Sequence, residues 1–334
     1  MRRPRVVRTP DTTDERIPVE VLITTPSFGK QSAEPWEALA RAGLSHRSPS
    51  GVHPLDAAQL SHEVARSSAL IVGLDTVDAA VFAAAPHLKV VAKHGVGVDN
   101  IDCAAAAAAG VRVVNAPGSN SGAVADLTLG AMIAVARRLV PAHLSMLDGR
   151  WDRFPGVELA GRTLGLVGFG RIGQAVAKRA HAFDMTVAAY DPYLPAEVFT
   201  THGVSQVELA ECVAGADFLS LHMPGAPGST ALLDAVLLGS MKQGSYLINA
   251  ARGGLVDEAV VATMLTQGHL AGAALDAFAS EPLLRDAPLL TAPNVLLTPH
   301  IGAYTDRANA AMGTMVVADI ARVLHGEEPL NAVV

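Results

Sequence analysis

Short apolar runs alternate with alanine-rich segments through the first third of the chain. These runs predict strands at Val19–Thr24, Ala69–Gly73, Leu88–Lys93 and Val111–Asn115. The segments between them predict helices at Pro35–Ala42, Val77–Ala85 and Ile101–Ala109. Strands that alternate with helices in this way predict an α/β fold, with a mostly parallel sheet covered by helices on both faces.

The same alternation resumes after Gly161. Apolar runs predict strands at Thr163–Gly168, Thr186–Tyr190, Asp217–His222, Tyr246–Asn249, Gly272–Asp276 and Val295–Thr298. Helices are predicted at Arg171–Phe183 and, last in the chain, at Met315–Leu324. Two stretches of βα alternation in a chain of 334 residues predict two domains.

The segment between the two stretches has a different pattern. Asp126–Val140 is predicted to be one long helix that is apolar nearly all round, which indicates burial against a second surface. A subunit interface is one such surface. Trp151 and Phe154 follow in a chain with only 4% aromatic residues, and we expect them to pack at the same edge.

Composition narrows the class of protein. Half of the residues are hydrophobic and 17% are charged, which favours buried cores over disorder. No apolar run is long enough to cross a bilayer, and the polar start, residues 1–18, is expected to be a flexible tail without a secretory signal. A net charge of -7 with no basic stripe disfavours nucleic acid as a partner.

The two cysteines, Cys103 and Cys212, lie far apart and without a Cys-x-x-Cys or Cys/His neighbourhood. Neither a metal site nor a disulfide is therefore predicted. Both are expected to be buried small residues in a reducing cytosol, which predicts a cytoplasmic protein.

A glycine-rich turn predicts a dinucleotide site. Gly168-Phe-Gly-Arg-Ile-Gly173 has the spacing G-x-G-x-x-G, with a strand-like run before it and a helix-like run after it. Asp191 ends the next predicted strand, where a carboxylate binds the ribose hydroxyls and repels a 2′-phosphate. This context favours NAD over NADP, and over the alternative of a tight turn without a ligand.

A second pair of glycines lies in the loop Gly95-Val-Gly97. Asn100 stands where a third glycine would be needed, so this is not predicted to be a second cofactor loop. Consecutive backbone N–H groups in such a loop suit a small anion such as a carboxylate. A plain turn is an equally good interpretation of the spacing.

Three residues are candidates for catalysis because each follows a predicted strand, where ligands of parallel sheets bind. Arg252 lies before a pair of glycines, Glu281 before Pro282, and His300 between Pro299 and Gly302. A guanidinium binds a planar 2-oxo carboxylate, an imidazole exchanges a proton near neutral pH, and a carboxylate stabilises the protonated imidazole. Each alone has a simpler interpretation as a surface loop residue, so their shared placement carries the prediction.

The motifs together resemble one known family. Lys93-His-Gly-Val-Gly-Val-Asp-Asn-Ile-Asp102, the glycine loop, Asn249–Asp257, Gly272–Phe278 and Thr298–Ala303 resemble the D-isomer-specific 2-hydroxyacid dehydrogenases. Within that family the chain looks most similar to short phosphoglycerate dehydrogenases without a regulatory domain. The resemblance implies two Rossmann-like doubly wound domains with a cleft between them. It implies a substrate domain at 1–111 and 301–334, and an NAD-binding domain at 112–300.

The resemblance also implies residue roles. Arg252 would bind substrate, Glu281 and His300 would form the acid/base pair, and the backbone of Val96 and Gly97 would bind the substrate carboxylate. Lys93 and His94 would lie beside the substrate. The residues implied for the cofactor are Gly168, Gly170, Arg171, Ile172, Gly173, Asp191, His222, Pro224, Ala250 and Asp276. The helix from Asp126 would join a homodimer.

The chain differs from phosphoglycerate dehydrogenases at two places that concern the substrate. Phosphoglycerate dehydrogenases tend to have arginines where this chain has Gly73 and Lys93-His94. Lys30, Lys93 and His94 are the candidates to supply positive charge in their place. The expected function is therefore hydride transfer between NAD(H) and a small D-2-hydroxy acid, with 3-phosphoglycerate as one candidate. The alternatives are another 2-oxo acid (glyoxylate, hydroxypyruvate or a phosphonate analogue) and a non-catalytic, NAD-sensing interaction protein.

Overall fold

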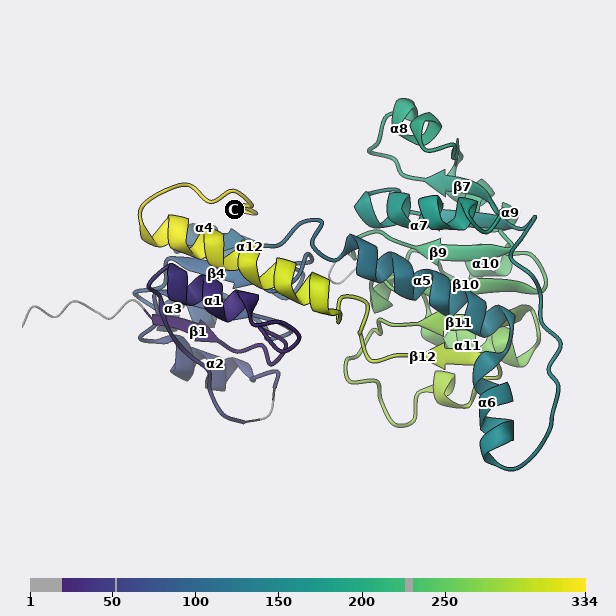
Figure 1. The fold of residues 1–334 in the computed structure, drawn as a ribbon, viewed down its shortest axis with the longest axis horizontal. Coiled ribbons are helices and arrows are strands. Elements are labelled where there is room, and N and C mark those ends of the chain that lie inside the picture. Colours follow the sequence, from purple (N-terminus) through teal and green to yellow (C-terminus); the bar gives the residue numbers. More distant parts are fainter. Residues whose placement is uncertain (1–19, 52, 226–230) are drawn as a thin grey trace, which may run out of the picture.

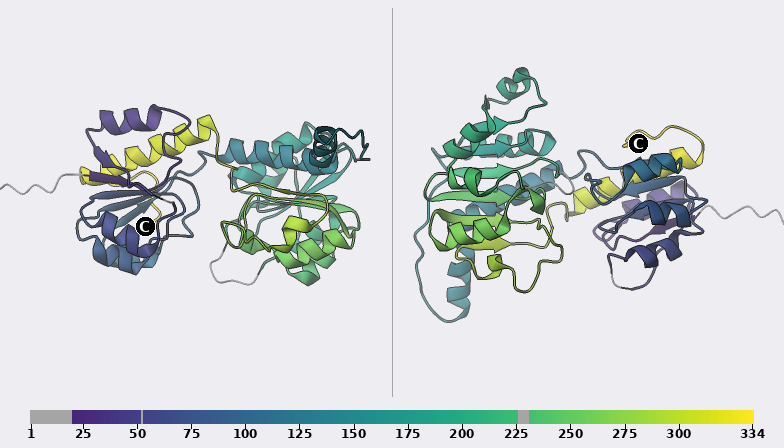
Figure 2. Two further views of the ribbon diagram at one scale, coloured as in Figure 1. Left: turned by 90° about the horizontal axis from the view of Figure 1, so that it is seen from below. Right: turned by 180° about the vertical axis from the view of Figure 1, so that it is seen from behind.

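The computed structural model describes residues 20–51, 53–225 and 231–334, which fold around two separate parallel sheets (Figure 1). The predicted tail and Val19 lie outside the described residues. Figure 2 shows the sheets as the centres of two lobes, joined by the chain that enters α5 and the chain that enters α12. The α/β prediction is confirmed: every pair of neighbouring strands within the two sheets is parallel.

The first sheet has five strands in the order β2-β1-β3-β4-β5, a doubly wound order. Its strands are β1 (Glu20–Ile23), β2 (Ser45–Arg47), β3 (Ala69–Val72), β4 (Val90–Lys93) and β5 (Arg112–Val114). One face packs against α1 (Glu34–Arg41) and the C-terminal α12 (Asp306–Leu324). The other face packs against α2 (Ala57–Val64), α3 (Ala79–Ala84) and α4 (Cys103–Ala108). Both ends of the described chain therefore build this lobe.

The second sheet has seven strands in the order β12-β11-β10-β9-β6-β7-β8. They are β6 (Thr163–Val167), β7 (Thr186–Tyr190), β8 (Ser205–Gln206), β9 (Phe218–Leu221), β10 (Ser245–Asn249), β11 (Leu270–Leu275) and β12 (Val295–Leu297). β6 lies between β7 and β9, so the winding reverses there. A ligand crevice is expected at the carboxyl ends of the strands beside such a reversal.

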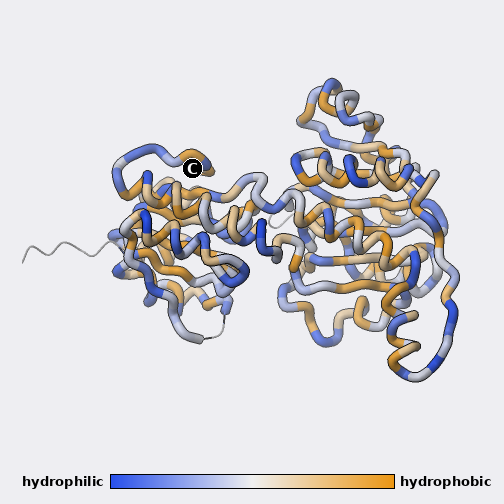
Figure 3. The backbone as a smooth tube through the Cα atoms, viewed as in Figure 1, coloured by the Kyte–Doolittle hydropathy of each residue, from blue (hydrophilic) through white to orange (hydrophobic). Residues whose placement is uncertain are grey.

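Helices cover both faces of the second sheet. The core on one face includes residues of α5 (Ser121–Ala136), α7 (Arg171–His181) and α8 (Ala196–Thr201). The core on the other includes residues of α9 (Leu209–Gly215), α10 (Ala235–Gly239) and α11 (Glu258–Thr266). The short 3-10 turns η1 (Gly253–Leu255) and η2 (Pro288–Thr291) complete the lobe. Figure 3 shows the apolar residues concentrated along the central strands of both sheets.

The helix predicted over Asp126–Val140 differs in the structure. α5 ends at Ala136, Arg138 has a left-handed backbone with φ 51°, and α6 (Leu139–Leu147) follows in a new direction. α5 packs against α7, β10 and β11, so its apolar residues are largely buried within the chain. The exposed apolar side chains lie on α6 instead, with Leu147 at 69%.

The change from one sheet to the other also lies slightly later than the sequence predicts. β5 pairs with β4 in the first sheet, so the strand predicted at Val111–Asn115 belongs to that lobe as a whole. The boundary predicted between residues 111 and 112 therefore falls just before β5, which is a strand of the first sheet. Among the described helices, none combines the length and the hydropathy needed to cross a membrane.

Candidate active site

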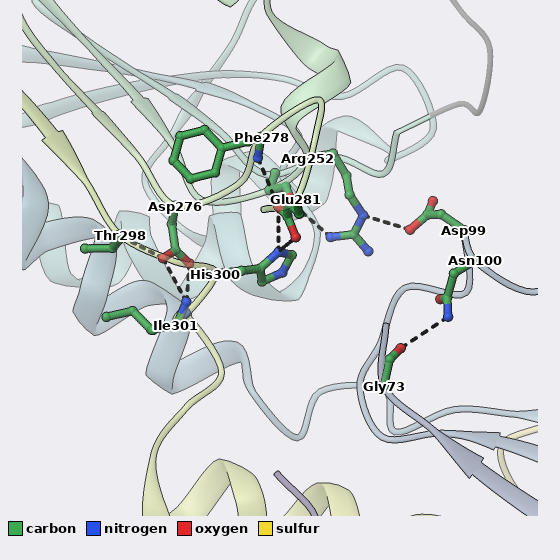
Figure 4. Close-up of polar contacts among 12 residues, drawn as sticks. Gly73, Asp99, Asn100, Arg252, Asp276, Phe278, Glu281, Thr298, His300 and Ile301 are labelled. Carbon is green, nitrogen blue, oxygen red and sulfur yellow. Dashed lines mark hydrogen bonds and ion pairs between the residues drawn. The ribbon is translucent and has the colours of Figure 1, made fainter. Parts of the chain in front are cut away.

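The carboxyl ends of three neighbouring strands bring the predicted catalytic residues to one edge of the second sheet. The register pairs Asn249 of β10 with Leu275 of β11, and Leu275 with Leu297 of β12. Arg252 follows the first of these strands and His300 the third, and Figure 4 shows both residues beside Glu281. Strand order thus gathers side chains that are far apart in the sequence.

Glu281 and His300 form a pair. Nδ1 of His300 lies 2.9 Å from each carboxylate oxygen of Glu281, and the Phe278 amide donates to the same carboxylate at 3.0 Å. Burial raises the pKa of Glu281, but the hydrogen bonds from His300 and Phe278 and the charges of His300 and Arg252 hold it below its usual range. An ionised Glu281 fixes the proton on Nδ1 and leaves Nε2 free for proton exchange.

The turn that carries His300 is held by Asp276, which is only 5% exposed. Oδ1 of Asp276 accepts from the Thr298 hydroxyl at 2.6 Å and the Ile301 amide at 2.8 Å, and Oδ2 accepts from the Gly302 amide at 2.8 Å. These bonds support a left-handed backbone at His300, with φ 52°. Asp276 was predicted to hold the nicotinamide; the structure adds that its carboxylate holds the turn that carries His300.

Arg252 reaches across to the first lobe. Its Nε donates to Oδ2 of Asp99 at 2.7 Å, and its Nη1 donates to the Ala251 carbonyl at 2.8 Å. Asn249 holds this loop, because its side chain accepts from the Ala251 amide and donates to the Arg252 carbonyl. Asp99 was not predicted as a site residue, although it follows the Gly95–Gly97 loop by two positions.

The Gly95–Gly97 loop faces Arg252. A Cβ added to Gly97 would lie 1.5 Å from Nη2 of Arg252, so any side chain here would displace the guanidinium from its present position. The amides of Val96 and Gly97 donate to no partner within the described part of the chain, whereas the Val96 carbonyl accepts from the Asn115 side chain at 2.6 Å. Two free amides next to a guanidinium have the geometry expected of a carboxylate site.

Lys93 and His94 lie beneath this loop. The Lys93 ammonium donates to Oδ1 of Asn100 at 2.7 Å and to the Gly73 carbonyl. Burial, followed by the charge of Arg252, lowers the pKa of Lys93 to about 8. Burial, with a smaller contribution from Lys93, lowers the pKa of His94 to about 4, so His94 is neutral near pH 7. His94 therefore does not supply the positive charge expected of it.

The glycine loop fits a dinucleotide. Gly168 has φ +96°, and a Cβ there would lie 2.6 Å from the His222 carbonyl. A Cβ on Gly173 would lie 2.4 Å from the Gly168 carbonyl, so the third glycine allows α7 to approach the turn. A Cβ on Gly170 would meet nothing within 4 Å, which leaves the start of α7 open to a pyrophosphate.

Asp191 follows β7 and lies against this loop. Its Oδ2 accepts from the Phe169 amide at 2.9 Å and its Oδ1 from the Tyr193 amide at 3.0 Å. Each carboxylate oxygen has a second lone pair for a ribose hydroxyl. The carboxylate thus stands at the place where it would exclude a 2′-phosphate.

The remaining predicted cofactor residues differ in their surroundings. His222 bonds the Ser220 hydroxyl through Nε2 at 2.8 Å, and its Nδ1 is buried without a partner in the described chain. Burial lowers the pKa of His222 to about 3. Ala250 lines a small pocket with Asp276, whereas Ile172 packs against the core and Arg171 and Pro224 are exposed.

Comparison with known proteins agrees with this geometry. The model of the D-isomer specific 2-hydroxyacid dehydrogenase family, NAD binding domain, matches residues 129–302. D-3-phosphoglycerate dehydrogenase of Methanocaldococcus jannaschii is 47% identical over 252 residues, 75% of this chain and 48% of that protein. The Mycobacterium tuberculosis enzyme of the same name is 44% identical over 281 residues, 83% of this chain and 53% of that protein. The chain thus spans about half the length of the curated relatives it matches.

Solved structures match over nearly the whole chain. A protein from Thermus thermophilus superposes with a TM-score of 0.83 at 39% identity, covering 95% of this chain and 100% of that one. An NADPH-dependent glyoxylate/hydroxypyruvate reductase from Sinorhizobium meliloti, in complex with NADP and malonate, superposes with a TM-score of 0.82 at 31% identity. This superposition covers 95% of this chain and 97% of the reductase. The chain belongs to the D-isomer-specific 2-hydroxyacid dehydrogenase family.

Proposed function

We propose that this protein transfers a hydride between NAD(H) and a small D-2-hydroxy acid or its 2-oxo acid. The observation that carries the proposal is the meeting of Arg252, the Glu281–His300 pair and the free Val96 and Gly97 amides. In this proposal the first lobe binds substrate and the second binds the cofactor. NAD, when bound, supplies the acceptor or donor of the hydride.

The side chains have distinct roles in this reaction. Arg252 and the amides of Val96 and Gly97 bind the substrate carboxylate, and Arg252 also stabilises negative charge on the carbonyl oxygen. Nε2 of His300 donates a proton to that oxygen in reduction and removes it in oxidation. Glu281 stabilises the protonated imidazole between the two events, since its own pKa is held low.

Two observations bear on the substrate. The curated relatives named above are D-3-phosphoglycerate dehydrogenases, which supports 3-phosphoglycerate and phosphohydroxypyruvate. The residue at position 73 favours a substrate without a phosphate, because glycine supplies no cationic side chain where phosphoglycerate dehydrogenases tend to have an arginine. The Lys93 ammonium nearby already donates to Gly73 and Asn100.

The test is a panel of 2-oxo acids assayed by NADH oxidation, including phosphohydroxypyruvate, hydroxypyruvate, glyoxylate and pyruvate. We expect turnover with at least one of them. NADH binding without turnover on the panel or on branched and phosphonate analogues would contradict the proposal and support the NAD-sensing alternative. The ratio of kcat/KM for phosphohydroxypyruvate to hydroxypyruvate decides between the two substrate classes.

Cofactor choice gives a further prediction. Asp191→Ala is expected to raise the KM for NADH roughly 10- to 100-fold, because this is the factor in affinity that a hydrogen bond to a charged group contributes. The same variant is expected to use NADPH better than wild type does. Asp191→Asn keeps an acceptor for the Phe169 amide but removes the charge, so it should admit NADPH with a smaller loss of NADH affinity. Measured kcat/KM ratios for the two cofactors check this. An unchanged ratio in both variants contradicts the assignment of Asp191.

We further propose that a second copy of this chain covers α6. Several large apolar side chains on and after this helix are exposed: Leu139, Val140, Leu144, Met146, Leu147 and Trp151. A groove of about 200 Å³ lies between Val140 and Leu144 on one side and Val295 and Leu296 on the other. Several exposed apolar side chains on one short helix are typical of an interface, and a self-complementary surface gives a two-fold dimer.

This dimer is testable by mass in solution. Wild type is expected to have about twice the chain mass of 34.5 kDa by light scattering, and Leu144→Glu with Leu147→Glu is expected to give a monomer. Leu330→Glu, at a leucine that is 73% exposed in the other lobe, is the matched control and should remain dimeric. A wild-type protein that is monomeric at micromolar concentration contradicts this proposal.

We also propose that the protein is located in the cytoplasm. Both cysteines are free thiols, which suits a reducing compartment. Cys212 is buried as expected, and burial raises its pKa to about 12. Cys103 is only half-buried, because it begins the short helix α4 at the surface of the first lobe.

A further inference from the structure

The contact between Asp99 and Arg252 joins the two lobes at the proposed active site. Asp99 lies on the loop after β4 of the first sheet, and Arg252 on the loop after β10 of the second (Figure 4). Their atoms Oδ2 and Nε are 2.7 Å apart, and the side chains are 34% and 32% exposed. Since each residue belongs to a different sheet, any separation of the lobes breaks this bond.

From this contact we propose that Asp99 is a positioning residue, which sets the orientation of the Arg252 guanidinium for the substrate carboxylate. The inference rests on the proposed function. The guanidinium is planar, so its orientation is fixed once two of its nitrogens are held. Asp99 holds Nε and the Ala251 carbonyl holds Nη1, which turns Nη2 toward Gly97 and its free amide.

Asp99 has a well-defined position because hydrogen bonds to neighbouring loops hold the loop that carries it. The neighbouring Asn100 donates to the carbonyls of Gly73, at 3.2 Å, and Asp75, and accepts from Lys93. Asp75 is 1% exposed and in turn accepts from the Leu55 amide at 2.8 Å and the Thr24 hydroxyl at 2.6 Å. These hydrogen bonds connect the loop after β4 to the loops after β1 and β3.

Because the Asp99–Arg252 pair is partly exposed, its effect on substrate orientation can be measured apart from its effect on folding stability. An ion pair that solvent reaches contributes little to stability, because water screens the charges. Orientation of a substrate-binding group matters far more for catalysis, where a misplacement of about 1 Å can cost roughly 100-fold in rate. Loss of Asp99 should therefore change substrate kinetics without changing thermal stability or cofactor binding.

The test compares two variants of Asp99 on the full chain. Asp99→Ala is expected to lower kcat/KM for the best 2-oxo acid by about 10- to 100-fold, with an unchanged Kd for NADH and an unchanged Tm. Asp99→Asn keeps an oxygen that accepts from Nε, so it should stay within about fivefold of wild type, the most that an exposed ion pair contributes. Glu328→Ala removes another carboxylate–arginine pair, with Arg112 at 2.6 Å, and is the control that should match wild type.

Two further measurements test whether the effect passes through Arg252. Asp99→Ala combined with Arg252→Ala should be no slower than Arg252→Ala alone, because the two side chains act as a unit. Binding of oxamate to the NADH complex, measured by calorimetry, should weaken in Asp99→Ala without any need for turnover.

The outcomes separate this inference from the proposed function. Wild type that neither reduces a 2-oxo acid nor binds oxamate overturns the proposed function and this inference with it. An active wild type with an Asp99→Ala variant of equal kcat/KM overturns this inference alone. So do equal losses in Asp99→Ala and Asp99→Asn, a parallel fall in Tm and NADH affinity, or additive losses in the double variant.

Discussion

His300→Ala is expected to lower kcat for 2-oxo acid reduction by about 10²- to 10⁴-fold, the usual contribution of a positioned acid/base. The KM for NADH should stay close to that of wild type, because the variant leaves the glycine loop and Asp191 intact. Single-turnover rates of NADH oxidation at saturating substrate measure the chemical step directly. His325→Ala is the matched control, since His325 is exposed at the end of α12.

Glu281→Gln separates the proton carrier from the group that supports it. Glutamine keeps an oxygen that accepts from the Phe278 amide and from Nδ1 of His300 but removes the negative charge. We expect a smaller loss of kcat than in His300→Ala, and little additional loss when the two changes are combined. A His300→Ala variant that keeps near wild-type turnover would falsify the assignment of the acid/base.

Arg252→Ala is expected to lower kcat/KM for the 2-oxo acid by about 10³-fold. Removal of one partner from a charged, hydrogen-bonded contact costs about 2–5 kcal/mol, and here the same group also stabilises charge on the carbonyl oxygen. Arg252→Lys should recover little of this loss, because an ammonium cannot bond Asp99, the Ala251 carbonyl and a carboxylate in one plane.

The readout for Arg252 is the division of the loss between kcat and KM. A rise in KM alone means that Arg252 only binds the substrate carboxylate, whereas losses in both mean that it also acts in the transition state. Arg41→Ala, which removes an exposed arginine paired with Glu37, controls for the loss of a cation. An Arg252→Ala variant with wild-type kcat/KM on the best substrate contradicts the proposed function.

The strands of both sheets could be predicted where the local pattern is strong. Thr163–Gly168 and Thr186–Tyr190 match β6 and β7 within a residue, because buried parallel strands are continuous apolar runs. β2 and β8 were missed because they are short, polar edge strands whose existence depends on a neighbour. The break of the long helix at Arg138 was also missed, since nothing in its apolar pattern marks the left-handed residue.

The site was predictable to a similar depth. Strand ends and the glycine spacing were enough to predict that Arg252, Glu281 and His300 lie at one sheet edge and that Asp191 lies beside the glycine loop, since parallel strands present their carboxyl ends at one edge. The neutral state of His94 was not predictable, because it comes from burial by residues distant in sequence. The bonds of Asp276 to the His300 turn depend likewise on the pairing of β11 with β12.

By itself the sequence determined the class of fold and the cofactor loop, and it selected the three residues that we propose carry the chemistry. These depend on local spacing, which the chain carries at every position. Only the tertiary structure decided that Arg252 meets Asp99 and Gly97, across a sequence separation of 153 residues for the ion pair. It also decided that Lys93 and His94 are enclosed in the first lobe. Such contacts arise from the packing of two lobes, and no local pattern specifies which loop of one will face which loop of the other.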